Sequence, residues 1–263
     1  MALLWDGSPH LPNQLGSVAR AKSALALLGA CCTLGGCALD TRTLEAANAS
    51  GSSGAGGTGI SGSGSASKPP PPIDLPICEY PAGASVQPGC DTIAENAGFT
   101  QDITGWDPEA YSIKIDWEAG DAKAAPDSGS IAVTNTMFGT SDGLAPGAGT
   151  QCIPATPGAT YDMAGDVFIP EGQGDGMVGG GPYVGEAGLS ILFWANPDCS
   201  DVEPTHGSFQ SDLVLTTGAW IHVEGGAVAP DVAKAMSLRV LTIKPFKQFK
   251  FKALFDNVLL RER

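Results

Sequence analysis

Seven cysteines are the residues of this chain whose type and spacing bear most directly on chemistry. Three of them, Cys31, Cys32 and Cys37, fall within the stretch "LGACCTLGGC" near the N-terminus. A structural zinc site needs C-x-x-C-like spacing or a nearby histidine, and this stretch has neither. A short basic segment and an apolar run precede Cys37, which is the layout of an export signal. Because the run is shorter than the roughly 20 apolar residues of a membrane span, we expect the segment to be removed.

The residues before Cys37, "LGG", resemble the lipobox of bacterial lipoproteins, in which a leucine and two small residues precede the cysteine that receives the lipid. The residues before Cys31, "LGA", fit the same pattern. Cleavage at Cys31 would leave an apolar region of only about eight residues, which favours Cys37 as the lipidation site. The sequence therefore predicts an export signal over residues 1–37 and an outer-membrane lipoprotein at the cell surface or on the periplasmic face.

Residues 38–72 have a composition that cannot bury a core. They are mostly Gly, Ser and Ala from residue 46 to residue 68, and they end in consecutive prolines, Pro69 to Pro72. This composition is typical of a flexible, disordered tether with a root-mean-square reach of roughly 30 Å. We expect residues 73–263, the length of one domain, to be the folded part of the chain.

The folded part contains the other four cysteines, an even number, which in an exported protein predicts two disulfides. Three pairings exist for four cysteines. We favour Cys78 with Cys90, because the two bracket a short Pro/Gly loop, and Cys152 with Cys199, because they lie on separate strand-like segments. A zinc site built from the same cysteines would need C-x-x-C spacing, which is absent.

The charge of the chain is acidic and unevenly distributed. There are 28 Asp and Glu residues against 14 Lys and Arg, for a net charge of −14, and the basic residues concentrate between Lys234 and Arg263. An acidic surface repels nucleic acid and anionic membranes. We therefore expect no nucleic-acid partner and contact with a membrane only through the lipid anchor. The basic C-terminal run is interpreted as one strand face that complements the acidic remainder.

The folded part alternates apolar and polar residues with a period of two. In "AYSIKIDWE", Tyr111, Ile113, Ile115 and Trp117 alternate with polar residues, which predicts a strand with Trp117 in the core. The following segments predict further strands, separated by Gly and Pro turns: "SGSIAVTN", "TYDMAGDVFIP", "GLSILFWAN", "WIHVEGG", "MSLRVLTI" and "FKFKALFDNVLL". Only the stretch 231–235 suggests a short helix. This pattern predicts an all-β fold, a two-sheet antiparallel β-sandwich or jelly roll.

Five segments, in order, resemble motifs of the jelly-roll carbohydrate-binding modules of the galactose-binding-like superfamily. They cover about residues 96–260 and read "NAGFTQDITGW", "DSGSIAVTN", "QCIPATPGATYDMAGDVFIP", "GAWIHVEGGAVAP" and "FKALFDNVLL". The resemblance implies the jelly-roll fold, a noncatalytic role in binding a glycan, and packing roles for Trp106 and Trp220. Modules of this shape also serve as accessory and adhesive domains, so the fold alone does not assign a function.

We expect no required cofactor, but modules of the family that the chain resembles often carry a structural calcium ion near the first and last strands. Asp256 matches the carboxylate ligand of the family, and backbone carbonyls from Asn96 to Phe99 would supply further oxygens. This chain departs from the family at Thr100, where a Glu commonly follows Gly-Phe, and the departure removes one carboxylate. The alternative is that Asp256 hydrogen-bonds a turn.

Sugar sites combine aromatic faces with a few placed polar groups. In "YDMAGDVFI", the residues Tyr161, Met163, Val167 and Ile169 share one face, which leaves Asp162, Asp166 and Phe168 on the other. In "LSILFWAN", the alternation directs Trp194 away from Leu189, Ile191 and Phe193. If these two strands are neighbours, Phe168, Asp166 and Trp194 form one outward platform; the alternative is that a loop covers it. Tyr183, in the Gly-rich segment between the two strands, is a second candidate.

The sequence contains the residue types of an enzyme motif but not the structural elements that the motif requires. Gly139 to Gly143 fits G-x-S-x-G, but "LAPGAGTQC" cannot form the helix that a nucleophile elbow requires. Only His206 and His222 lie in the folded part, so a catalytic triad would need one of them to meet a serine by chance. We therefore predict a noncatalytic module that binds a glycan or polysaccharide. The alternative is a structural or protein-interaction module of the cell envelope, and a hydrolase is a remote alternative. The oligomeric state stays open.

Overall fold

The computed structural model describes residues 75–80, 85–125, 128–140, 143–173, 177–178, 181–200 and 206–263. All of them belong to one unit of the chain, Ser63–Arg263. The export signal predicted for residues 1–37, with both lipidation candidates, and the tether predicted for residues 38–72 lie outside the described residues. These assignments therefore stay predictions.

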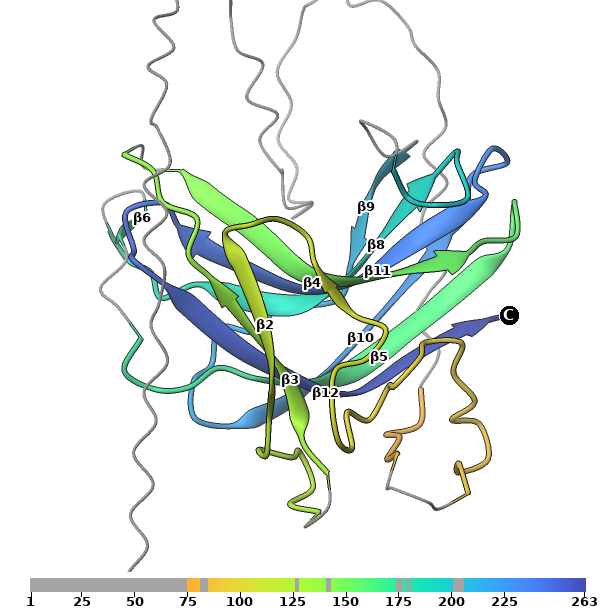
Figure 1. Cartoon of the computed structure of the whole chain (residues 1–263), viewed down its shortest axis with the longest axis horizontal. Helices are drawn as coiled ribbons and strands as arrows, with labels where there is room; N and C mark the ends of the chain where they lie inside the picture. The colour runs from red at the N-terminus through yellow and green to blue at the C-terminus, as the bar shows by residue number, and fades with distance from the viewer. Residues whose placement is uncertain are drawn as a thin grey trace, which may run out of the picture. The chain divides into compact units, whose positions relative to one another are not determined.

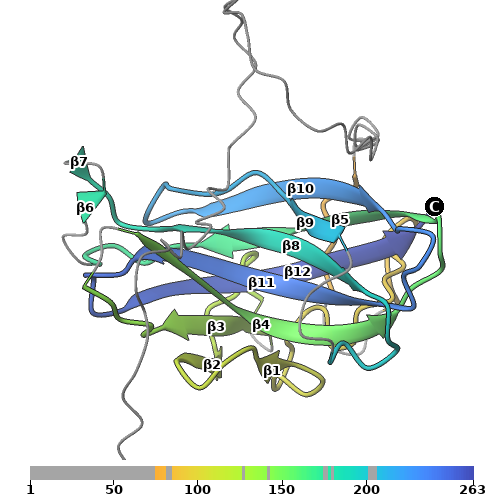
Figure 2. The same ribbon diagram turned by 90° about the horizontal axis from the view of Figure 1, so that it is seen from above.

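The described part of the chain forms β-strands that pair antiparallel. The strands are β1 (Asp107–Pro108), β2 (Ile113–Glu118), β3 (Ser130–Asn135), β4 (Leu144–Pro154), β5 (Thr160–Phe168), β6 (Met177–Val178), β7 (Gly181–Pro182), β8 (Glu186–Trp194), β9 (His206–Gln210), β10 (Trp220–Val228), β11 (Ala235–Pro245) and β12 (Phe251–Glu262). The first sheet has the order β1-β4-β11-β8-β9 and the second sheet the order β10-β5-β12-β3-β2, while β6 and β7 form a separate hairpin. The two sheets lie face to face (Figures 1 and 2). The predicted all-β, two-sheet antiparallel sandwich is confirmed.

No helix occurs in the described residues, and so none is long and apolar enough to cross a membrane there. The stretch 231–235, where the sequence suggested a short helix, forms a turn that leads into β11.

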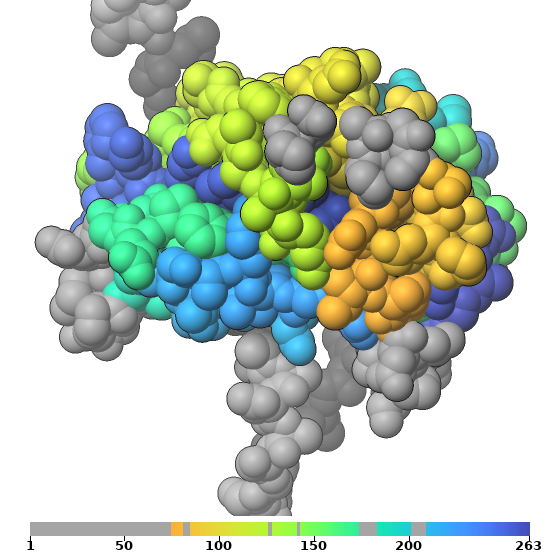
Figure 3. All heavy atoms as spheres, turned by 90° about the horizontal axis from the view of Figure 1, so that it is seen from below, coloured from red at the N-terminus to blue at the C-terminus, as the bar shows by residue number. Residues whose placement is uncertain are grey.

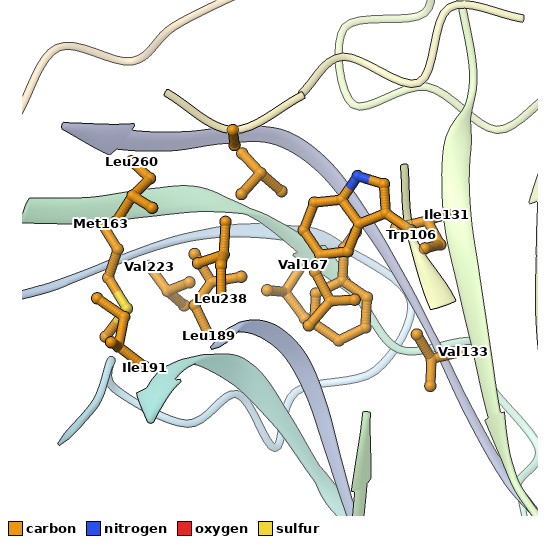
Figure 4. Packing of buried hydrophobic residues seen from close by; sticks show 14 of the residues in the cluster. Trp106, Ile131, Val133, Met163, Val167, Leu189, Ile191, Val223, Leu238 and Leu260 are labelled. Carbon is orange, nitrogen blue, oxygen red and sulfur yellow. The ribbon is translucent and has the colours of Figure 1, made fainter. Parts of the chain in front are cut away.

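The core lies between the two sheets and follows the predicted alternation. The inward side chains of β8 and β5 are fully buried: Leu189, Ile191, Phe193, Tyr161, Met163 and Val167. Figure 4 shows Met163 and Val167 of the second sheet close to Leu189 and Leu238 of the first. Trp106 is 4% exposed in the same core, as predicted, and its Nε1 donates a hydrogen bond to the backbone oxygen of Glu95 (3.1 Å).

Strand β4 begins seven residues before Gln151, in a Gly- and Pro-rich stretch that the sequence analysis did not identify as a strand. Glycine has a low β propensity, which is why this stretch does not look like a strand. Glycine is needed here because the sandwich leaves no room for a side chain. A Cβ atom on Gly147 would lie 2.1 Å from Cδ1 of Ile113, and one on Gly149 would lie 3.0 Å from Cγ2 of Val240. The neighbouring large side chains fill the space that these glycines leave.

The prediction that Trp117 lies in the core is wrong. The side chain is 38% exposed, and its Nε1 donates a hydrogen bond to the backbone oxygen of Phe99 (2.7 Å). Tyr111, expected on the same inward face, is fully exposed, because β2 begins only at Ile113. Both residues belong to the edge of the second sheet, where no further strand covers them.

The two disulfides form in the pairing favoured from the sequence: Cys78 with Cys90, and Cys152 with Cys199. The N-terminal segment that contains the first bridge lies on the outer side of the second sheet, where Leu75 packs in one cluster with Ala164 of β5 and Leu259 of β12. In Figure 3, seen from below, this segment is the orange region on the face of the molecule. Part of the outer face of the second sheet is therefore covered.

Candidate functional site

A row of polar residues crosses the outer face of the first sheet from one edge to the other. The register of the strands places one residue from each strand in this polar row: Asp107 of β1, Thr150 of β4, Arg239 of β11, Ser190 of β8 and Gln210 of β9. Neighbouring strands lie about 4.8 Å apart, so the polar row is about 19 Å long. Figure 1 shows the first sheet as the upper layer, with β11 curving upward toward both of its ends, so that this outer face is concave along the strands.

The centre of the polar row holds polar atoms without protein partners. Arg239 is 7% exposed and Ser190 is fully buried, although both side chains point away from the core. Within the described part of the chain, neither Nε of Arg239 nor Oγ of Ser190 has a hydrogen-bond partner. Buried polar atoms are nearly always paired with protein or with ordered water. These two atoms therefore keep hydrogen-bonding capacity that no described protein group uses.

Glu109 fixes the orientation of Arg239. The guanidinium Nη2 donates to both carboxylate oxygens of Glu109, at 2.6 and 2.5 Å. The pair neutralises the charge of Arg239, and Nε takes no part in it. The Glu109 side chain is 34% exposed, so the ion pair itself lies at the border of the concave face.

An aromatic residue and an apolar cluster flank the polar row. Trp194, at the end of β8, is half-buried, and its Nε1 donates to Oγ of Ser237 (2.8 Å) on β11. On the opposite side of the polar row, Ala148, Leu241 and Ile243 form a small buried cluster. Leu213 packs against this cluster, so the groups of the concave face that suit a sugar site are the polar row and Trp194.

The predicted platform of Phe168, Asp166 and Trp194 does not exist. Strands β5 and β8 belong to different sheets, so Phe168 and Asp166 lie on the outer side of the second sheet and Trp194 on that of the first. Alternation identifies which residues share a face of a strand, but it carries no information on which strands are neighbours. Phe168 packs instead against Trp220 of β10, with ring centroids 5.4 Å apart. Trp220 is half-buried in this pair.

Asp166 faces outward, as predicted, but it is not available to a ligand. The residue is 4% exposed; Oδ1 contacts Nδ1 of His222 at 2.9 Å, and Oδ2 accepts a hydrogen bond from Nδ2 of Asn257 at 3.1 Å. Asp162, on the same face, is 2% exposed between Arg261 and Arg263. Both carboxylates are thus satisfied by the protein itself.

Tyr183, the second candidate, is half-buried just before β8. Its hydroxyl is buried without a hydrogen-bond partner among the described residues, and burial raises the pKa of the phenol. Its role as a ligand residue stays a prediction.

The calcium site also stays a prediction. Asp256 is fully buried, where its Oδ2 accepts a hydrogen bond from the backbone N–H of Ala122 (3.0 Å) and its Oδ1 one from that of Asn257 (2.7 Å). Asn96, the other predicted ligand residue, donates through Nδ2 to the backbone oxygen of Asp102 (2.8 Å). Among the described residues, no three or more His, Cys, Asp and Glu side chains are grouped so as to hold a metal ion. The bonds of Asp256 match the alternative, in which it hydrogen-bonds a turn.

The enzyme motif of residues 139–143 leads into a strand, β4, and not into a helix, so it lacks the framework of a nucleophile elbow. Ser141 and Asp142 lie outside the described residues. His222 contacts Asp166 through Nδ1, and its Nε2 lies 3.6 Å from Oε1 of Glu224. Among the residues that the structure describes, the polar neighbours recorded for this imidazole are carboxylates.

Sequence reasoning missed the residues at the centre of the polar row. The signal was an arginine placed between Leu238 and Val240 in "MSLRVLTI", a strand whose other residues are mostly apolar. A charged side chain on a strand of this kind is almost never buried unless a side chain of opposite charge pairs with it. The partner, Glu109, lies 130 residues away in the sequence and could not be found from local pattern.

Neither a protein family nor a curated protein matches the sequence. Among solved structures, the enzymatically active domain of tailspike protein 4 from bacteriophage CBA120 is 12% identical over 68% of this chain and 22% of that chain, with a TM-score of 0.47. The CBM22-2 xylan-binding domain from Paenibacillus barcinonensis is 16% identical over 64% of this chain and 98% of that domain, with a TM-score of 0.44. The CBM22-1 xylan-binding domain of the same bacterium is 13% identical over 63% and 91%, with a TM-score of 0.42. All three TM-scores are below 0.5, so these similarities assign neither a family nor an activity.

Proposed function

We propose that this protein is a noncatalytic module that binds a glycan or polysaccharide along the concave face of the first sheet. The observation that carries the proposal is the pair of buried, unpartnered polar atoms at the centre of the polar row, Nε of Arg239 and Oγ of Ser190. Sugar hydroxyls both donate and accept hydrogen bonds, so one ligand can satisfy the two atoms. The motifs that resemble carbohydrate-binding modules support the same function.

The geometry favours an oligosaccharide over a single sugar. The polar row crosses all five strands of the first sheet, which gives a length of about 19 Å. A chain of sugars lying across the strands would meet Arg239 and Ser190 in the middle, with Trp194 beside them for stacking. The net charge of −14 disfavours acidic polysaccharides, so we expect a neutral glycan.

The proposal includes export and a lipid anchor. Residues 1–37 would be the export signal, Cys37 the lipidated residue with Cys31 as the alternative, residues 38–72 the tether, and residues 73–263 the displayed domain. Disulfides support an oxidising compartment. Mass spectrometry of the N-terminal peptide from the native membrane fraction tests the anchor. We expect a diacylated cysteine at position 37 or 31. A mature N-terminus at Cys37 or Cys31 that carries no lipid would overturn the lipid anchor.

A binding screen tests the glycan function. The oxidised protein is applied to a glycan array and to insoluble polysaccharides, each with and without calcium. We expect retention on at least one neutral glycan, lost in the Trp194→Ala variant and kept in Phe249→Ala, which changes an exposed aromatic residue in the loop between β11 and β12. A folded protein that binds nothing would contradict the proposal and favour a structural or protein-interaction module of the envelope.

A further inference from the structure

Strand β2 forms a free edge of the second sheet. It pairs with β3 on one side, and no strand of the described part of the chain pairs with its other side. Figure 2 shows β2 at the margin of the sandwich, beside β1 of the first sheet. Since β2 is six residues long, it offers a further strand a ladder of main-chain hydrogen bonds.

The unpaired groups of this edge belong to the odd-numbered residues of β2. The residue that follows β3 donates from its N–H to the backbone oxygen of Ser112 (2.9 Å), so the even-numbered residues exchange their bonds with β3. The N–H and C=O groups of Ile113, Ile115 and Trp117 point to the other side of the strand. Among the described residues, the N–H of Ile113 has a backbone partner in the turn before β2. The C=O of Ile113 and both groups of Ile115 and Trp117 have no backbone partner there.

A second copy of β2 completes this edge when the two strands run antiparallel about a two-fold axis at Ile115. Ile115 then lies opposite Ile115 of the second copy, and Trp117 lies opposite Ile113. The N–H of Ile115 meets the C=O of Ile115, and the N–H of Trp117 meets the C=O of Ile113. Each copy thus donates two main-chain hydrogen bonds and accepts two, which uses every one of the unpaired groups except the C=O of Trp117.

The same register places opposite charges face to face. Lys114 lies opposite Asp116 of the second copy, and the symmetry makes this pair twice. Within one copy the two side chains contact each other at 2.7 Å and are 71% and 42% exposed. Such an exposed pair contributes little, so both side chains can turn to the second copy. Moving the axis by one residue sets Lys114 against Lys114 or Asp116 against Asp116, and like charges directly opposite are destabilising.

The other charges of residues 99–125 lie outside the ladder or have a counter-charge. Asp102 accepts hydrogen bonds from Asn96 and Thr104, and Asp107 belongs to β1, so each copy keeps two negative charges beside β2. Charges are screened beyond about 8 Å at physiological ionic strength, so the directly opposed pairs decide the register. The remaining charges occur in opposite pairs: Glu118 with Lys252, Glu109 with Arg239, and Asp121 two residues before Lys123.

We propose that two copies of the chain associate edge to edge through β2, which joins their second sheets into one antiparallel sheet. The contact also covers Ile115, which is half-buried, and Trp117, which is 38% exposed. An unrelated extended peptide offers the same main-chain bonds, but the charges of β2 complement those of β2 itself. Because the contact is small, we expect a dissociation constant on the order of 10 to 100 μM. The association is independent of glycan binding.

Sedimentation velocity tests the proposal on the full-length, oxidised chain without an attached lipid, at physiological ionic strength. We expect a monomer that becomes a dimer as the concentration passes through the stated range. Site-resolved amide exchange locates the contact. Over the same range, exchange should slow at Ile115 and Trp117 and stay unchanged at Lys114 and Asp116, whose N–H groups already bond to β3. Association through the N-terminal apolar run does not produce this pattern.

Charge variants test the register. Lys114→Glu and Asp116→Lys each place two like-charge pairs across the axis, so each is expected to weaken the dimer at least about tenfold. A mixture of the two variants should form a dimer of nearly wild-type affinity, because each copy then meets opposite charges at both positions. Lys234→Glu makes the same change of charge at an exposed residue before β11 and should leave the affinity unchanged.

Three results would overturn the proposal: a protein that stays monomeric at about ten times the expected dissociation constant, a dimer whose affinity neither charge variant lowers, or a mixture of the variants that associates no better than either alone. The first result would leave the edge to an extended peptide of another protein. The second would place the contact elsewhere on the chain.

Discussion

Arg239 and Ser190 lie directly opposite each other on β11 and β8, and each presents a buried polar atom that has no hydrogen-bond partner in the described part of the chain. Two such atoms side by side at the centre of a concave sheet reduce the stability that the fold would otherwise have, because buried polar groups without partners are costly. A ligand with hydroxyl groups would remove that cost. Substitutions at this pair therefore distinguish a glycan-binding site from a purely structural role of the two residues.

Ser190→Ala should weaken glycan binding and spare the fold. The substitution removes one hydrogen bond to the ligand, worth about 1 kcal/mol, so we expect a loss of affinity of roughly fivefold. The free energy of unfolding should stay constant or rise slightly, since an unpartnered hydroxyl leaves the interior. Calorimetric titration and denaturant unfolding measure the two quantities. A large loss of stability would mean that Ser190 serves packing and not binding.

The two disulfides should differ in their effect on binding. Each stabilises by restricting the unfolded chain, by about 3 kcal/mol for the loop between Cys78 and Cys90 and about 4 kcal/mol for that between Cys152 and Cys199. Cys152 lies on the outer face of β4, so its bridge ties this strand to the segment after Trp194. We expect replacement of both cysteines of either bridge by serine to lower the melting temperature. Only loss of the Cys152–Cys199 bridge should also weaken glycan affinity at a temperature where both variants are folded; equal affinities would contradict this.

Gly98 should not tolerate a side chain. A Cβ atom there would lie 2.5 Å from Cβ and 2.7 Å from the backbone oxygen of Tyr80, so alanine must push the N-terminal segment away from the second sheet. We expect Gly98→Ala to lower the free energy of unfolding by about 1–3 kcal/mol. Gly120→Ala is the matched control, because its Cβ would meet only Cδ2 of Leu254, at 3.4 Å. If urea unfolding gives the same loss for both, the close approach is not the cause.

Asp256 should make stability depend on pH when calcium is absent. Burial, foremost, raises the pKa of this carboxyl from the usual 3.8 to about 8 in the folded protein. Between these two values the folded state holds a proton that the unfolded state has released, so the free energy of unfolding falls as pH rises from about 4 to about 8. Asp256→Asn should flatten this dependence. A wild-type stability that rises over the same range in a chelating buffer would contradict the assignment.

Added calcium tests the other prediction for Asp256. A bound ion needs the ionised carboxylate, so calcium should raise the melting temperature at pH 8 and have little effect at pH 5. Asp256→Asn should abolish the increase. If calcium leaves the melting temperature of the wild type unchanged, the role of Asp256 is to accept hydrogen bonds from the backbone of Ala122 and Asn257 and not to bind a metal ion.

The alternation of apolar and polar residues predicted the buried face of the central strands, but not that of the edge strand β2, and it did not predict which strands are neighbours in a sheet. Leu189 and Met163 are fully buried as expected, and the sandwich follows from many such short strands. The platform failed because Phe168 and Trp194 belong to different sheets. The order of strands within a sheet depends on long-range packing, which a period of two does not encode.

The candidate site could not be predicted from the sequence, because the order of the strands was not known. Ser190 is an ordinary residue in its own strand, and it gains significance only because Arg239 lies opposite on β11. Asp166 was predicted on the correct face, but its partners His222 and Asn257 come from two other strands and bury it. Local pattern gives the direction of a side chain, whereas its burial depends on what the fold brings against it.

The most direct test of the glycan function is the affinity of the Arg239→Lys variant for a neutral oligosaccharide found in the screen, measured by calorimetric titration beside the wild type and Phe249→Ala. Lysine keeps the positive charge beside Glu109 but lacks the Nε donor that has no protein partner. We predict a loss of affinity of at least about tenfold for Arg239→Lys, with Phe249→Ala equal to the wild type. Unchanged affinity in a folded Arg239→Lys variant would contradict a binding site on the concave face of the first sheet.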